Sequence, residues 1–172
     1  MGGMTIERRQ TEFGREGQCY CNFTDSVIDF ELTDDETPVE YGEKCAEAAG
    51  HMSRELINDI LEAAKRYCLY FIELCRENAG DDFDITEFPP VTADTPAEEM
   101  RRYFEIGSVC VEEPDDFSQI GYRLSGSCDW EIEHGFEADI LDGTLVYLGM
   151  FEMNSPWCEF APDDEWNFAN KH

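Results

Sequence analysis

The spacing of apolar residues changes once along the chain, and this change constrains the fold more than any other feature. From Ser53 to Asn78 apolar side chains recur every three or four residues, which is typical of an amphipathic helix. From Ile106 to Met150 apolar and polar residues largely alternate, which is typical of strands with one buried face. Helices followed by strands predict an α+β fold, with helices packed on a mostly antiparallel sheet built largely from the C-terminal half.

The main helix is predicted over about residues 53–78. Ser53 can cap it, because a serine hydroxyl at this position accepts a hydrogen bond from a backbone N–H of the first turn. A shorter helix is expected over residues 39–50. Another is expected from Thr95-Pro96-Ala97-Glu98 to about Phe104, because these four residues match a capping box with proline at the first helical position.

Strands are predicted from alternation and from turn residues. The clearest hairpin joins residues 136–141 to residues 144–150, because Asp142-Gly143 supplies the positive φ angles of a type I′ turn. Two shorter strands are expected within residues 19–32. A long strand over residues 120–130 is expected to be half-buried, with one apolar and one polar face. The polar face carries Arg123, Ser125, Ser127 and Asp129.

We expect one domain that follows a flexible beginning. Residues 1–18 are polar and punctuated by glycine, so a flexible segment is predicted there and a single α+β domain over residues 19–172. Aromatic residues are spread from Phe13 to Phe168 and supply enough apolar surface for a core. The stretch from Asn154 has little periodicity and is expected to pack as an irregular tail.

The cysteines and the N-terminus favour a cytoplasmic protein. The chain has 8 cysteines, but they lack the dense, regular spacing of a small secreted scaffold, so reduced and buried thiols are expected. Residues 1–18 do not resemble a signal peptide, and no apolar run approaches the length of a membrane span. No membrane association is expected.

The chain is far more acidic than solubility requires. It has 12 Lys and Arg residues against 40 Asp and Glu residues, which gives a formal net charge of -28. Residues 103–170 contain 16 acidic residues and one basic residue, Arg123. Such a field repels nucleic-acid backbones and attracts basic protein surfaces. We therefore expect no direct nucleic-acid binding, and a basic protein as partner: a toxin, a nuclease or another nucleic-acid-binding protein.

The densest group of reactive side chains lies in the segment 128–135, where two predicted strands join. His134 with Glu133 or Glu131 could form an acid–base pair, because a carboxylate orients an imidazole and raises its pKa. In the structural interpretation, His134 bonds a turn carbonyl, Gly135 supplies a positive φ angle and the neighbouring tryptophan belongs to the core. The structural interpretation is favoured.

No metal, cofactor or covalent-catalysis signature accompanies this segment. Cys19 and Cys21 form one close pair of thiols, but a zinc site needs four N or S ligands, and neither His51 nor His134 belongs to a second pair. The chain also has no glycine-rich phosphate loop and no nucleophile elbow. We therefore expect no metal site and no cofactor, and favour a non-enzymatic role.

Three stretches carry a resemblance to a known group of proteins. They are residues 39–68, the segment 128–135 with its Trp-Glu-x-Glu-His-Gly motif, and the following hairpin of residues 143–149. Together they resemble the Trp-Glu-x-Glu-His-Gly domains of unknown function, which are common in Firmicutes and other bacteria and are sometimes placed near toxin and immunity loci. The resemblance implies a small bacterial α+β protein. It brings no established catalytic residues.

Three functions follow as hypotheses. The first, favoured by the charge of residues 103–170, is an acidic inhibitor of the immunity or nucleic-acid-mimic type that occupies a basic site on a toxin or nuclease. The second is a small hydrolase-like enzyme that uses His134 with Glu131 or Glu133. The third is a non-catalytic protein whose acidity serves only solubility. The candidate binding residues of the first hypothesis are Asp129, Glu131, Glu133, Glu137 and Asp139.

Overall fold

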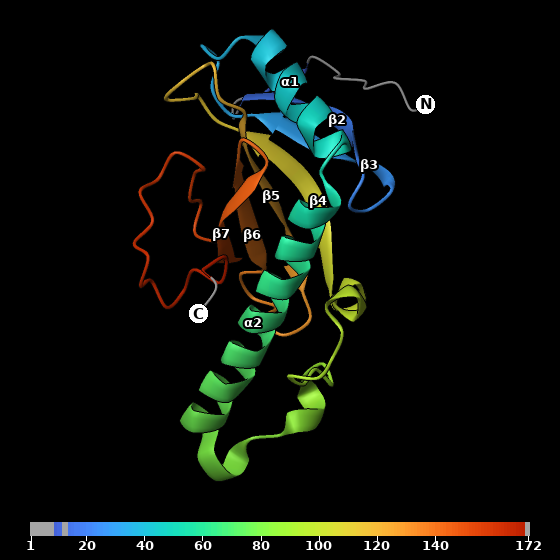
Figure 1. The fold of residues 1–172 in the computed structure, drawn as a ribbon, viewed down its shortest axis with the longest axis vertical. Helices are drawn as coiled ribbons and strands as arrows, with labels where there is room; N and C mark the ends of the chain where they lie inside the picture. Colours follow the sequence, from blue (N-terminus) through green and yellow to red (C-terminus); the bar gives the residue numbers. More distant parts are fainter. Residues whose placement is uncertain (1–8, 12–13, 171–172) are drawn as a thin grey trace.

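A twisted sheet with helices on one face forms the fold in the computed structural model, which describes residues 9–11 and 14–170 (Figure 1). Within these residues the sheet has seven strands, which lie side by side in chain order. Neighbouring strands run antiparallel except β3 and β4, which run parallel. The strands are β1 (Arg9–Thr11), β2 (Gly14–Cys21), β3 (Ser26–Leu32), β4 (Phe104–Val111), β5 (Gly121–Cys128), β6 (Phe136–Leu141) and β7 (Thr144–Met150). The predicted α+β class and mostly antiparallel sheet are therefore confirmed.

The two helices lie between the parallel strands in the sequence. A parallel pair cannot be joined by a tight turn, so the chain must cross from the end of β3 back to the start of β4. It does so through α1 (Val39–Gly50), α2 (Arg54–Ala79) and three 3-10 helices, η1 (Gly80–Asp82), η2 (Ile85–Glu87) and η3 (Ala97–Arg102). The helices lie in front of the sheet in Figure 1, where α1 packs mainly on β2 and α2 on β7.

The predicted start of α2 is confirmed. The Ser53 hydroxyl accepts a hydrogen bond from the Leu56 backbone N–H at 3.0 Å. Inside the helix, Tyr67 is fully buried and lies edge-on to Trp130, with 5.5 Å between ring centroids. The same tyrosine stacks on Phe168 at 4.9 Å. Tyr67 therefore ties the helix both to the loop after β5 and to the end of the chain.

The C-terminal segment, residues 151–170, begins on the opposite face of the sheet, where it contacts β5, and ends against α2. It contains no helix or strand, as predicted for an irregular tail. Its Trp157 lies against Gly121 of β5, where a Cβ would come within 2.6 Å of the indole. Arg123, expected on a water-exposed face, is only 7% exposed beneath this segment. That expectation was wrong because alternation within one strand does not reveal what a distant segment covers.

Two further predictions need correction. The capping box at Thr95 is absent: η3 has no side-chain cap, and the Thr95 hydroxyl accepts instead from the Thr92 backbone N–H at 2.9 Å, inside the preceding turn. Strand β2 begins at Gly14, inside the segment predicted to be flexible up to residue 18. Backbone pairing with β3 holds this polar stretch, since ladder hydrogen bonds do not require apolar side chains. Residues 1–8 lie outside the described part of the chain.

Candidate functional site

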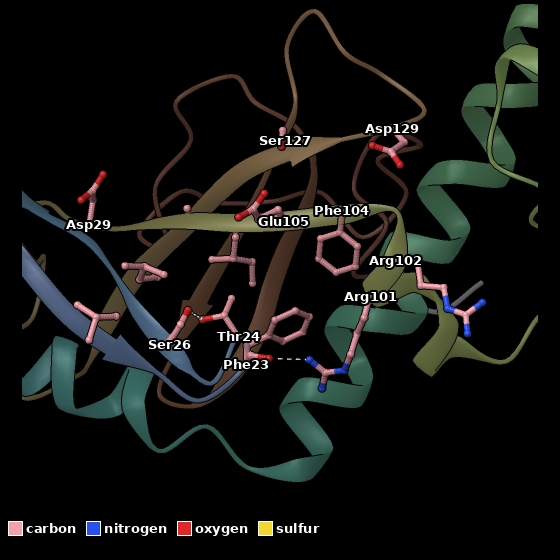
Figure 2. A pocket seen from close by; sticks show the side chains of 14 residues that line it. Phe23, Thr24, Ser26, Asp29, Arg101, Arg102, Phe104, Glu105, Ser127 and Asp129 are labelled. Carbon is pink, nitrogen blue, oxygen red and sulfur yellow. Dashed lines mark hydrogen bonds between the residues drawn. The ribbon is translucent and has the colours of Figure 1, made fainter. Parts of the chain in front are cut away.

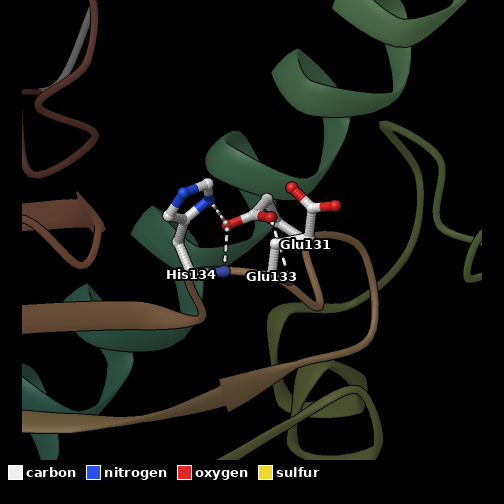
Figure 3. Close-up of side chains that lie close together, drawn as sticks. All are labelled: Glu131, Glu133 and His134. Carbon is white, nitrogen blue, oxygen red and sulfur yellow. Dashed lines mark hydrogen bonds and ion pairs between the residues drawn. The ribbon is translucent and has the colours of Figure 1, made fainter.

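The loop between β5 and β6 is shaped by the side chain of Glu131. This carboxylate is only 5% exposed, and its two oxygens accept the backbone N–H groups of Glu133 and His134, each at 3.0 Å (Figure 3). Gly135 closes the loop at φ +70°, and a Cβ there would lie 2.3 Å from the Gly126 carbonyl oxygen. Only glycine fits this position. The predicted structural role of this loop is therefore confirmed for Gly135.

The structure brings the three catalytic candidates together. His134 Nδ1 lies 3.2 Å from Glu131 Oε2, which is hydrogen-bonding distance, whereas we expected this ring to bond a turn carbonyl. The potential ligand atoms of Glu131, Glu133 and His134 all lie within 4.8 Å of one another. The His134 and Glu133 side chains are exposed, however, and the Glu131 carboxylate already accepts two backbone donors. The contact between His134 and Glu131 allows proton exchange, but the hydrogen bonds of the Glu131 carboxylate chiefly hold the loop in its conformation.

Asp129 is exposed on the other side of the same loop. Its backbone N–H donates to the Tyr103 carbonyl oxygen at 2.8 Å, which fixes the end of β5 next to the start of β4. Its side chain lines a cavity of about 680 Å³ between β3 and β4 (Figure 2). Neither Glu131 nor His134 lines this cavity. Asp129 therefore faces a different place from Glu131 and His134.

Glu137 and Asp139 are fully buried on the face of β6 that the C-terminal segment covers. Glu137 Oε1 accepts the Asn154 backbone N–H at 3.0 Å, and its Oε2 lies 3.9 Å from Arg123 Nε. Two carboxylates without water contact cannot touch a partner surface in this conformation. These two candidate binding residues instead form part of the interior.

Arg123 is the centre of this buried polar group. Its guanidinium donates to Glu112 Oε1 at 3.0 Å, to the Asn154 carbonyl oxygen and to Cys110 Sγ at 3.2 Å. A bond to Glu112 fixes the start of one loop, and the bond to Asn154 fixes the start of the C-terminal segment. Arg123 therefore links two segments that are far apart in the sequence.

Asp139 has the most perturbed carboxyl group of the cluster. In the sheet it lies opposite Arg123 on one side and Tyr147 on the other. Within the described part of the chain, neither of its oxygens has a hydrogen-bond partner. Burial, reinforced by the neighbouring Glu137 charge, raises the pKa of Asp139 to about 8. The carboxyl group is therefore mostly protonated at neutral pH.

Burial of Arg123 leaves one half of the chain without surface cations. It is the only Lys or Arg among residues 103–170, whereas just three of the 16 acidic residues of that stretch are buried: Glu131, Glu137 and Asp139. Nine of the 16 lie in residues 112–118 and 151–165, which we call the acidic loop pair and which both lie at the left of Figure 1. Seven of these nine are exposed: Glu113, Asp115, Asp116, Glu152, Glu159, Asp163 and Glu165.

The comparison with protein families gives one result. A family model matches residues 3–155, and it describes a domain of unknown function, DUF6985. The chain belongs to this family. No curated protein and no solved structure matches it. The part of the chain that matches the DUF6985 model includes both helices and the loop shaped by Glu131, and it ends with the fifth residue of the second acidic loop, residue 155.

Two further properties of this DUF6985 domain concern its helices and its cysteines. No helix in the described part of the chain is long and apolar enough to cross a membrane. All 8 cysteines fall within the described residues, where each is a free thiol. Six of them are buried, and Cys158 is exposed.

Sequence reasoning did not find the buried cluster around Arg123. One signal was present: a single arginine among 16 acidic residues is an obvious partner for several of them. The cavity between β3 and β4 was also missed, because it depends on how far these two strands pair along their length. The 71 residues between Leu32 and Phe104 separate the two strands in the sequence, so no local pattern reveals their pairing.

Proposed function

We propose that this DUF6985 domain is an acidic binding protein that engages a basic surface of a partner protein through the acidic loop pair. One observation carries the proposal. Because Arg123 is buried, residues 103–170 present exposed carboxylates and no Lys or Arg side chain to the solvent. A surface of one sign accelerates encounter with a surface of the opposite sign and disfavours wrong partners.

The loops suit this role better than the sheet. The sheet is covered by helices on one face and partly by residues 151–170 on the other, so Glu137 and Asp139 are withdrawn from any partner. Asp129 and Glu133 remain exposed, but they follow the end of β5, whereas residues 112–118 precede its start. Arg123 ties both members of the acidic loop pair to one point of the sheet, which reduces the ordering cost on binding.

The class of partner follows from the charge. Basic sites on nucleases, toxins and other nucleic-acid-binding proteins are built to attract polyanions, and a fixed array of carboxylates competes for such sites. We therefore favour an inhibitor of the immunity or nucleic-acid-mimic type that acts in the cytoplasm of a bacterium. The Trp-Glu-x-Glu-His-Gly loop and the toxin or immunity setting that its resemblance implies agree with this class.

A matched pair of variants tests the proposal. The loop variant carries Glu113→Gln, Asp115→Asn, Glu159→Gln and Asp163→Asn, four exposed acids without hydrogen bonds in the described structure. The control variant neutralises four exposed acids at the far end of α2 and beyond it: Glu77, Asp81, Asp82 and Glu87. Both variants lose the same charge, so only position differs.

The wild-type domain and both variants are used to capture partners from native cells, and the captured proteins are identified by mass spectrometry. We expect a basic protein that the wild type and the control variant retain and the loop variant loses. Capture of a neutral or acidic protein, or equal retention by both variants, would contradict the proposal.

The enzyme hypothesis keeps one favourable observation, the 3.2 Å contact between His134 Nδ1 and Glu131 Oε2. If this pair transfers protons, His134→Ala should abolish an activity and leave the melting temperature nearly unchanged, because the ring is half-exposed. A hydrolase screen of the wild type against this variant decides the question, and identical traces would exclude a catalytic role for the pair.

A further inference from the structure

Strands β3 and β4 pair along only part of their length. The parallel ladder joins Asp29–Leu32 to Ser108–Val111. The earlier part of each strand, Ser26–Ile28 in β3 and Phe104–Gly107 in β4, has no partner on the facing edge. On their other edges these segments pair with β2 and β5. The sheet therefore contains an internal fork, open toward the starts of the two parallel strands.

A bulge at Gly107 accompanies this fork. The register between β4 and β5 shifts between Ile106 and Ser108, so Gly107 falls outside the ladder. A bulge bends its strand and increases the local twist, which turns the beginning of β4 away from β3. The fork encloses the cavity of about 680 Å³ shown in Figure 2, a size typical of ligand pockets.

The two ends of the cavity carry opposite charges. Asp29 lies at the closed end, where it pairs with Ser108, and Arg102 lies two residues before the first residue of β4, at the open end (Figure 2). Within the described residues Arg102 is exposed and makes no hydrogen bond or ion pair. The neighbouring Arg101 is occupied: it donates to the Phe23 carbonyl oxygen at 2.6 Å and lies over the Phe23 ring.

Acidic and apolar groups line the walls between these ends. Glu105 and Asp129 are exposed and, within the described part of the chain, their carboxylates make no hydrogen bond or ion pair. Val27 is 59% exposed, which is unusual for a valine in a strand. The lining thus offers open backbone edges, an apolar side chain, free carboxylates and one free guanidinium.

We propose that the fork between β3 and β4 binds an extended peptide segment with basic side chains, its C-terminal carboxylate at Arg102. A peptide strand offers N–H and C=O groups on both edges and can pair with both open walls at once. From Phe104 to Ser108 a strand rises about 13 Å, which accommodates about four peptide residues. With its carboxylate at the starts of both walls, the peptide runs antiparallel to β3 and β4. The fork does not depend on the acidic loop pair.

The probe is a synthetic peptide of alternating lysine and valine, about six residues long, with a free C-terminal carboxylate. The matched probe is the same peptide with a C-terminal amide. In nuclear magnetic resonance spectra of the full chain, we expect amides of 26–28 and 104–107 to shift and to gain protection from hydrogen exchange. Unmoved amides in both segments would overturn the proposal.

Arg102→Gln separates carboxylate recognition from general charge attraction. We expect the acid peptide to bind wild type about tenfold more tightly than the amide peptide, and Arg102→Gln to abolish this preference. Arg54→Gln, at an exposed arginine of α2, is the matched control and should preserve the preference. Equal affinity of wild type for both peptides, or displacement of the peptide by millimolar inorganic sulfate, would show that no peptide terminus is read at this site.

Discussion

Asp139→Asn tests the interior of the molecule most sharply. The carboxyl group of Asp139 is fully buried, and its pKa is about 8 in the folded chain against an ordinary value of 3.8. Between these two pH values the folded chain holds a proton that the unfolded chain has released. The free energy of unfolding therefore falls as pH rises through this window, and the loss is complete above pH 8. Asparagine has a similar shape and does not titrate, so it removes this dependence.

The expected size follows from the slope. Where the folded state binds one proton more than the unfolded state, the free energy of unfolding drops by about 1.4 kcal/mol per pH unit. From pH 5 to pH 7 the wild type should thus lose about 3 kcal/mol relative to Asp139→Asn. Solvent does not screen this carboxyl group, because its side chain has no exposed surface.

Urea unfolding followed by tryptophan fluorescence, at several pH values between 5 and 7, measures this difference. Asp115→Asn is the control, since Asp115 is exposed and its substitution should leave the curve parallel to that of the wild type. The burial argument is refuted if the stability difference between Asp139→Asn and the wild type stays constant across this range.

Three substitutions and one labelling reaction test other parts of the same structure. Glu131→Ala leaves two backbone N–H groups without their acceptor and should cost about 3 kcal/mol in urea unfolding, whereas His134→Ala should cost under about 1 kcal/mol; equal costs would contradict the loop-shaping role. Gly135→Ala should cost at least about 2 kcal/mol, since the new methyl group meets the Gly126 carbonyl oxygen, and a normal melting temperature would disprove the stated fit. A maleimide should label Cys158 first in the folded chain, as peptide mapping can show, and faster labelling of Cys68 would contradict its burial.

Local sequence signals predicted the elements whose boundaries depend on near neighbours. The first helix occupies residues 39–50 as expected, and the hairpin turns at Asp142-Gly143 with φ angles of +49° and +75°. Ser53 caps α2 through its own hydroxyl. Turn geometry or capping determines each of these features within a few residues. The residues that predict the feature are therefore also the residues that produce it.

The candidate site depended on contacts that no local pattern contains. Alternation placed Arg123 on a polar face, and charge made Asp139 a candidate binding residue. Whether these side chains meet water is decided by residues 151–170, which pack on them from elsewhere in the chain. The fork between β3 and β4 arises from a parallel pairing across both helices. Charge counting identified residues 103–170 as the stretch with a single basic residue, but it could not show that the exposed acids of this stretch lie chiefly in loops.

The ionic-strength dependence of partner binding tests the central proposal most directly. The basic protein captured by the domain is titrated by isothermal calorimetry at about 50, 150 and 500 mM NaCl, a range over which the Debye length shortens several-fold. If the acidic loop pair carries the interface, the affinity of the wild type falls steeply with salt, and the loop variant shows both weaker binding and a shallower slope. An affinity that is indifferent to salt, or an identical slope for the wild type and the loop variant, would contradict the proposed function.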